Sequence, residues 1–124
     1  MKPRVFAPLA VAAVALAAGA VASARTAATP TLKGTVGPGF TISLKRGGTT
    51  VKTLRAGTYK FAVSDKGNIH NFVIEKEKGG TFEKTLTGVR FVGSKTATIK
   101  LTKGTWKYYC AAHESTMHGE FKVT

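Results

Sequence analysis

Three side-chain types that bind soft transition metals gather near the C-terminus of the sequence. A thiol, an imidazole and a thioether fall within eight residues, at Cys110, His113 and Met117. This segment connects two β-rich runs, residues 105–109 and 119–123. A hairpin-like connection between two strands can turn all three side chains toward one point. The segment therefore predicts a metal site.

A second imidazole completes the set. His70 stands forty residues before Cys110, at the start of the β-rich run 71–74. One thiolate, two imidazoles and a weak axial thioether form the ligand set of blue copper sites. The sulfur ligands favour Cu(I), whereas imidazoles suit either oxidation state. The sequence therefore predicts one copper ion, cycling between Cu(II) and Cu(I), held by His70, Cys110, His113 and Met117.

Each of these residues also has a structural reading. Cys110 could be a buried structural cysteine, because free cysteine is among the most buried residue types, and Met117 could simply fill the core. Taken alone, His70 could lie in a turn or on the surface. His118 follows Met117 directly, so in extended backbone its side chain points to the opposite side. We expect His118 to be exposed, the alternative being that it replaces Met117 as fourth ligand.

The N-terminus reads as a secretory signal peptide. Residues 1–24 combine a basic start at Lys2 and Arg4, an uncharged run and small residues before a cleavage site after Ala24. A retained membrane anchor is the alternative. We expect a protein exported to the periplasm or to the cell exterior or surface, with no stable membrane insertion after cleavage. A lone cysteine in such a compartment is usually buried or ligated.

The charge is strongly basic. Without Lys2 and Arg4, 17 of the 19 basic residues remain against six acidic ones, a formal net charge of +11. This surplus favours acidic partners or anionic cell-surface polymer. The lysines are scattered as isolated residues, so nucleic acid is not an expected partner. A cell-surface binding module that uses the basic face without any metal is one alternative function.

The remainder of the chain predicts an all-β fold. After a flexible lead at residues 25–30, short runs of alternating apolar and polar residues are separated by glycine and proline. No helical period is convincing, although a short helix or loop could occupy residues 81–92. We expect a Greek-key β-sandwich of about seven to eight strands over residues 31–124. The strand-like runs are residues 40–44, 51–54, 59–63, 71–74, 96–101, 105–109 and 119–123.

Several of these segments resemble the cupredoxins, in particular the plastocyanin, pseudoazurin and amicyanin group. Residues 57–61 and 69–72 are similar to the region of the family's first histidine. Residues 104–110, together with His113, Met117 and the last strand, are similar to its C-terminal ligand loop. The resemblance implies an eight-stranded Greek-key sandwich with a type 1 copper site at one end. It also implies that Met117 is the axial ligand and the other three ligands are equatorial.

The sequence departs from the family pattern at two points. Three residues separate His113 from Met117, whereas relatives commonly have two or four. Relatives also often carry a hydroxyl residue directly after the cysteine, where this chain has Ala111. Asn71, which follows the first histidine, must therefore bond to a backbone group or to another hydroxyl. Such bonds around the ligands fix the loop and tune the metal.

The ligand set on a small β domain predicts a one-electron carrier that is not an enzyme. The sequence has no Ser-His-Asp set, carboxylate pair or phosphate-binding glycine loop. We expect a monomer that exchanges electrons with a redox partner protein of acidic character. An exported protein that stores or delivers Cu(I) is the main alternative, because the same sulfur ligands would serve it.

Overall fold

The computed structural model describes residues 3, 10, 12–15, 19 and 27–124. The predicted signal peptide, residues 1–24, falls largely outside the described residues, as does the beginning of the predicted lead at 25–30. Among the described residues, no helix has the length and apolar character needed to cross a membrane. Residues 27–30 have no regular secondary structure, and the domain begins at Thr31.

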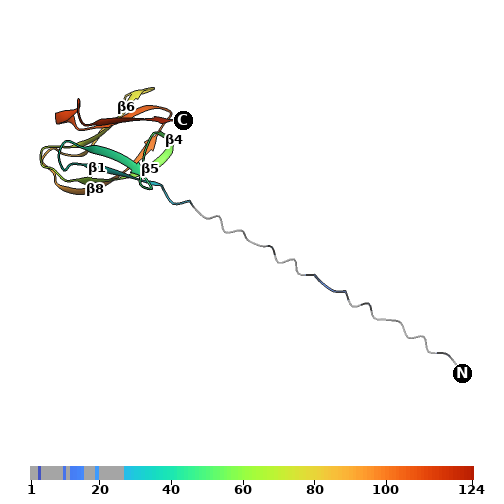
Figure 1. Cartoon of the computed structure of the whole chain (residues 1–124). Coiled ribbons are helices and arrows are strands. Elements are labelled where there is room, and N and C mark those ends of the chain that lie inside the picture. Colours follow the sequence, from blue (N-terminus) through green and yellow to red (C-terminus); the bar gives the residue numbers. More distant parts are fainter. Residues whose placement is uncertain (1–2, 4–9, 11, 16–18, 20–26) are drawn as a thin grey trace.

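The described chain folds into two layers of β-strands (Figure 1). One five-stranded sheet has the order β3-β2-β1-β5-β8, and the other has the order β4-β10-β9-β6-β7. The strands are β1 (Thr31–Val36), β2 (Ile42–Arg46), β3 (Thr49–Thr50), β4 (Thr53–Leu54), β5 (Gly57–Asp65), β6 (Phe72–Lys78), β7 (Glu83–Thr87), β8 (Gly93–Leu101), β9 (Gly104–Tyr109) and β10 (His118–Val123). Neighbouring strands are antiparallel, except that β1 pairs with β5 and β10 with β4 in parallel. The predicted all-β sandwich is confirmed.

Two details differ from the sequence-based expectation. Residues 81–92 contain β7 rather than a short helix, because β7 pairs with β6 and buries Leu86 and Thr87 at its end. The number of strands is also higher than expected. One predicted strand, residues 51–54, is replaced by two short ones, β3 just before it and β4 at its end, and each belongs to a different sheet. Within the described residues, the one helical segment is the short 3₁₀ helix η1 (Ala111–His113).

The core lies between the sheets and follows the period of two expected for strands. In β5, Tyr59, Phe61 and Val63 are buried, whereas Lys60 between them is exposed. Aromatic side chains fill much of the space, and burying each of them stabilises the fold by a few kcal/mol, roughly 1.5–3 for a phenylalanine. The largest fully buried side chains are Trp106, Phe61, Phe72 and Phe121.

Four loops meet at one end of the sandwich. They are residues 37–41, 66–71, 88–92 and 110–117, and each connects two strands. The ends of β1, β5 and β8 coincide there, because Asp65 pairs with both Val36 and Gly93. Two of these loops carry the two histidines, the cysteine and the methionine that the sequence predicts as ligands, so we call this the histidine end.

Phe40 lies in one of these loops rather than in a strand. The sequence pattern predicts a strand over residues 40–44, but β2 begins at Ile42. Gly37 and Gly39 both have positive φ, which glycine adopts without steric cost. The Gly37 N–H donates to the carbonyl of Thr41 (2.9 Å), closing a turn that projects Phe40 out of the sheet. The turn chemistry therefore overrides the apolar–polar alternation at this position.

Gly119 is required by the packing of Tyr108. A Cβ at position 119 would lie 2.2 Å from the Tyr108 ring, whereas a Cβ at Gly88 would meet nothing within 4 Å. Because Tyr108 is itself stacked on Phe72 with ring centroids 5.9 Å apart, it has little room to move. We predict that Gly119→Ala lowers the free energy of unfolding by about 1–3 kcal/mol. Chemical denaturation of this variant beside Gly88→Ala tests the prediction, and equal losses in both variants would contradict it.

Candidate metal centre

Three potential ligand atoms converge at the histidine end. The Nδ1 atoms of His70 and His113 are 3.2 Å apart, and the Cys110 Sγ lies 3.9 Å from the first and 3.8 Å from the second. His70 comes from the loop after β5, Cys110 directly follows β9, and His113 ends η1. His70 and Cys110 are buried and His113 is partly exposed. The structure thus brings together three of the four residues that the sequence predicts as ligands.

The separations fit a single metal ion. Protein nitrogen and sulfur ligands lie roughly 2.0–2.3 Å from a small transition metal. Two ligands of one ion therefore cannot lie more than about 4.0–4.6 Å apart. The three measured separations, 3.2, 3.8 and 3.9 Å, all satisfy this limit. A soft thiolate beside two imidazoles suits copper and zinc better than calcium or magnesium, which prefer oxygen ligands.

Backbone hydrogen bonds hold the loop of residues 110–117 in a compact form. The His113 N–H donates to the Cys110 carbonyl (3.2 Å), and the Met117 N–H donates to the His113 carbonyl (2.8 Å). The Cys110 N–H in turn donates to the Met117 carbonyl (3.0 Å). These three bonds join the three predicted ligand residues of this loop to one another, so their relative positions are set without a metal.

Met117 and His118 point to opposite sides of the chain. Met117 is fully buried in the core cluster that also contains Cys110, whereas His118 is exposed. The His118 Nδ1 lies 2.7 Å from the carbonyl oxygen of Glu114, so the ring is turned back onto the surface of the loop. The expected exposure of His118 is therefore confirmed, while an axial role for Met117 remains a prediction.

Asn71 joins the loop of the first histidine to the loop of the cysteine. Its side-chain Oδ1 accepts a hydrogen bond from the Ala111 N–H (2.7 Å), and its own N–H points at the Cys110 Sγ (3.4 Å). The partner that the sequence left open is thus a backbone group, so no hydroxyl is needed at position 111. The N–H directed at sulfur gives the buried Cys110 side chain a hydrogen-bond donor from the loop of the first histidine.

Asp65 and Gly67 support His70 from the other side, and sequence reasoning missed both. The buried Asp65 accepts a hydrogen bond from the Gly67 N–H at its Oδ1 (3.2 Å). Gly67 lies against the imidazole, since a Cβ there would be 3.0 Å from the His70 Cδ2. An aspartate that bonds the backbone two residues further on is a known turn device, so the Asp65-Lys66-Gly67 segment carried a usable signal.

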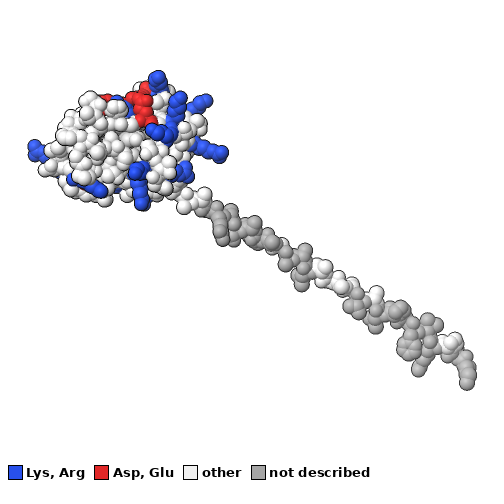
Figure 2. Space-filling model, viewed as in Figure 1, with Lys and Arg blue, Asp and Glu red and all other residues white. Residues whose placement is uncertain are grey.

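The acidic residues gather on the outer face of one sheet. Figure 2 shows red side chains together on one side of the domain, with blue ones around them. Lys107 is their centre: it pairs with Glu114 and Glu77 (Nζ–Oε1 3.7 Å for Glu77) and is in register with residues of both neighbouring strands. We call this group the acidic strip, and its members are Glu75, Glu77, Glu83, Glu114 and Glu120, five of the six acidic residues of the chain. Scattered basic residues in the sequence gave no sign of this arrangement.

The acidic strip perturbs the pKa of its members. Burial raises the pKa of Glu77, and a hydrogen bond and charge repulsion from Glu120 raise it further, against the lowering effect of Lys107. Burial also raises the pKa of Tyr109 to about 12, assisted by its hydroxyl bond to Glu83 (3.1 Å). The pKa of Lys107 is raised mainly by its hydrogen bond to Glu114.

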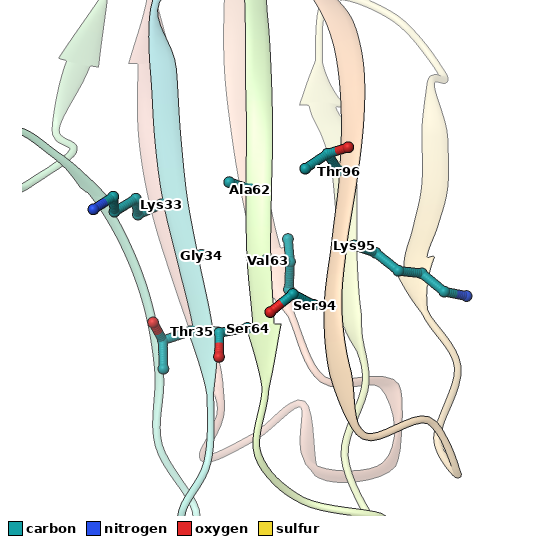
Figure 3. Close-up of a pocket in the computed structure, with 9 residues that line it drawn as sticks. All are labelled: Lys33, Gly34, Thr35, Ala62, Val63, Ser64, Ser94, Lys95 and Thr96. Atoms are coloured by element: carbon teal, nitrogen blue, oxygen red, sulfur yellow. The ribbon is translucent and has the colours of Figure 1, made fainter.

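A shallow hollow elsewhere on the domain offers no soft ligands. It lies across β1, β5 and β8, has a volume of about 230 Å³, and is drawn in Figure 3, where Lys33 and Lys95 extend away to its two sides. Its lining has no imidazole, thiol or carboxylate, so it does not compete with the histidine end as a transition-metal site. The residues that line it are Lys33, Gly34, Thr35, Ala62, Val63, Ser64, Ser94, Lys95 and Thr96.

Loss of the Asn71 side chain should loosen the histidine end. In Asn71→Ala the Ala111 N–H loses its acceptor, and the loss of one intramolecular hydrogen bond costs about 0.5–1.5 kcal/mol of unfolding free energy. We expect faster hydrogen exchange at the Ala111 amide and a lower midpoint of chemical denaturation. Asn68→Ala, an exposed substitution in the same loop, should change stability by no more than about 0.5 kcal/mol. Unchanged exchange at Ala111 in the Asn71 variant would contradict this assignment.

Removal of one charge from the acidic strip should change the pH dependence of stability. The raised pKa of Glu77 means that the folded state binds this proton more tightly than the unfolded chain does. The resulting stabilisation is present at acid pH and is lost as the pH rises through the ordinary glutamate range and then through the folded-state pKa. Glu120→Gln removes the negative charge that repels the Glu77 carboxylate. We therefore predict that this variant has a lower Glu77 pKa and loses less stability as the pH rises.

The measurement is a carboxyl NMR titration together with thermal melts at pH 3 and pH 7. Glu114→Gln serves as the control. It also removes one negative charge, but this charge is a partner of Lys107, so we expect no increase in thermal stability at pH 7. A Glu77 pKa that does not move in Glu120→Gln would contradict the prediction.

Comparison with known proteins places the fold. No protein-family model matches the sequence, and no curated protein matches it either. Solved structures do match. The copper protein rusticyanin aligns with a TM-score of 0.58 at 18% identity, over 80% of each chain. Reduced rusticyanin aligns with a TM-score of 0.55 at 23% identity, over 80% of this chain and 81% of that one.

A third structure, rusticyanin from Thiobacillus ferrooxidans, aligns with a TM-score of 0.50 at 24% identity, over 80% of this chain and 79% of that one. These identities support a statement about fold and not about subfamily, so the grouping with plastocyanin, pseudoazurin and amicyanin remains a prediction. The alignments cover about four-fifths of this chain. The chain has the cupredoxin fold.

Proposed function

We propose that this chain holds one copper ion in a type 1 site and transfers single electrons between partner proteins. The observation that carries the proposal is the convergence of one thiol and two imidazoles, with their ligand atoms all within 4.8 Å of one another. The rusticyanin structures with the same fold are described as copper proteins, which adds support. His70, Cys110 and His113 are the proposed equatorial ligands and Met117 the proposed axial one.

The residues of this chain would shape the site in complementary ways. When bound, copper would supply the one-electron couple. Burial of Cys110 and Met117 keeps water from the sulfur side, and the Asn71 N–H donates a hydrogen bond to the Cys110 sulfur. Because the loop bonds already fix the relative backbone positions of Cys110, His113 and Met117, this loop should rearrange little with a change of charge. His113 is the partly exposed ligand residue, so its imidazole is the proposed route for the electron to the surface.

The surface around His113 suits transient docking of a protein. Phe40, Ile69 and Val92 are 60%, 51% and 58% exposed at the histidine end. In Figure 2 the end of the domain that carries η1 is mostly uncharged, whereas most basic side chains in view lie toward the other end. An apolar contact area of this kind, with lysines and arginines further out, fits a redox partner of acidic character. Export of the protein to the periplasm or cell exterior belongs to the same proposal.

The alternative of a copper-delivery protein is less well supported. Delivery requires a ligand set that opens to hand over the metal. Here two of the proposed ligands, Cys110 and Met117, have no exposed surface, and the loop that carries them is closed by backbone bonds. These features favour a site that retains its metal through many redox cycles. A carrier of this type turns over no substrate, so the proposed role is not enzymatic.

A visible spectrum tests the copper proposal. We expect the purified metal-free protein, given one equivalent of Cu(II), to turn strongly blue, to bleach with ascorbate and to recover on reoxidation. Cys110→Ser should remove the blue band, because the colour requires a thiolate ligand, whereas Thr116→Ser in the same loop should keep it. A colourless wild-type sample with Cys110 shown to be reduced would refute the proposal. Rapid loss of Cu(I) to a competing chelator would instead favour delivery.

A further inference from the structure

The ring of Phe40 contacts both histidines of the candidate centre. Its centroid lies 5.4 Å from that of His70 and 4.9 Å from that of His113, at interplanar angles of 74° and 83°. The two imidazoles are themselves 5.0 Å apart at 71°. All three rings therefore meet edge to face, the arrangement that aromatic pairs prefer.

Phe40 is in an unusual place for a phenylalanine. It is 60% exposed, so most of its surface gains nothing from burial in the core. It is nevertheless held in place, because the turn that carries it is closed by the bond from the Gly37 N–H to the Thr41 carbonyl and by the Thr41 hydroxyl donating to the Pro38 carbonyl (3.1 Å). The loop thus places the Phe40 ring against the two imidazoles, although this position leaves most of the ring exposed to water.

The imidazoles lack the usual hydrogen-bonded support. A metal-binding histidine ordinarily donates its second ring nitrogen to a carboxylate, a carbonyl or water, and this bond sets the orientation of the ring. Here the Nδ1 atoms converge, and in the described part of the chain no protein group forms a hydrogen bond with Nε2 of His70 or His113. Among protein groups, packing contacts are therefore what bears on the outer edges of the rings. Gly67 packs against one edge of His70, and Phe40 is the side chain that touches both rings.

We propose that Phe40 is a positioning residue of the metal centre, which sets the orientation of both imidazoles before any metal binds and covers them from solvent afterwards. The inference rests on the proposed function, since it takes the two histidines to be ligands. It assigns to the loop of residues 37–41, which supplies no ligand, the task that hydrogen bonds perform in most histidine sites.

The test compares Phe40→Ala and Phe40→Leu with Phe82→Ala. Phe82 is a suitable control because it is also a partly exposed phenylalanine, but it packs on Trp106 and not on the histidines. In the metal-free wild-type protein, NMR should show contacts from the Phe40 ring to both imidazoles and one conformation for each histidine. In Phe40→Ala we expect the imidazole signals to broaden or double, while the β-sheet signals stay unchanged.

Copper affinity supplies the second measurement. Loss of a group that orients metal ligands typically weakens binding roughly 10- to 100-fold. We expect a weakening in that range for Phe40→Ala, a smaller one for Phe40→Leu, which keeps apolar cover but loses the ring edge, and none for Phe82→Ala. Transfer of copper to an external chelator should accelerate in the same order.

The outcomes separate this inference from the copper proposal. If wild-type protein binds copper, and Phe40→Ala has unchanged imidazole conformations and unchanged affinity, the positioning role is overturned while the copper proposal stands. If wild-type protein binds no copper but the imidazoles lose their single conformation in Phe40→Ala, Phe40 still positions the rings and the copper proposal falls. If Phe40→Leu has the same copper affinity and imidazole conformations as the wild-type protein, the aromatic edge plays no part in the positioning.

Discussion

The pairing of β6 with β9 is the constraint on which the candidate centre depends. The two strands are antiparallel and Val73 is in register with Tyr109. The residues just before Val73 must therefore lie beside the residues just after Tyr109. This register places His70 and Asn71 next to Cys110 although forty residues separate them in the chain. The bonds of Asn71 to Ala111 and Cys110 continue the contact beyond the last paired residues. A slip of one residue would turn the side chains of β6 to the opposite face and separate the ligands.

The candidate centre is rigid on one side and adaptable on the other. The buried side consists of the cysteine, the methionine and the strand ends, which are held by backbone hydrogen bonds. The outer side consists of three aromatic rings from three loops, which pack edge to face on one another. Hydrogen bonds fix atoms more narrowly than aromatic contacts do, so changes of ligand position should occur at the imidazoles first. This division suits a centre whose metal stays in place while its partly exposed histidine meets other proteins.

Charge and apolar surface are segregated over the domain in a way that its composition does not reveal. The basic surplus favours contact with acidic molecules over much of the surface. On the outer face of one sheet the acidic strip makes the surface locally negative, because several glutamates lie around Lys107. The histidine end is instead dominated by exposed apolar side chains. The domain therefore presents an acidic face and an apolar end that meet at Glu114, the strip residue next to His113.

The sequence by itself determined the fold class and the cluster. Alternation of apolar and polar residues shows which side chains face inward, and this pattern is local, so most strands were predicted within a few residues. Cys110 and His113 were recognised by their type and spacing, and His70 by its chemical match to them. Only the tertiary structure decided that Phe40 leaves its strand, that Asn71 finds the Ala111 backbone, that Asp65 and Gly67 support His70, and that three glutamates meet around Lys107. Each of these contacts joins residues through turn geometry or through pairing of distant strands. Neither is encoded in the periodicity of a single segment, because the register between strands is set by the packing of the whole sandwich.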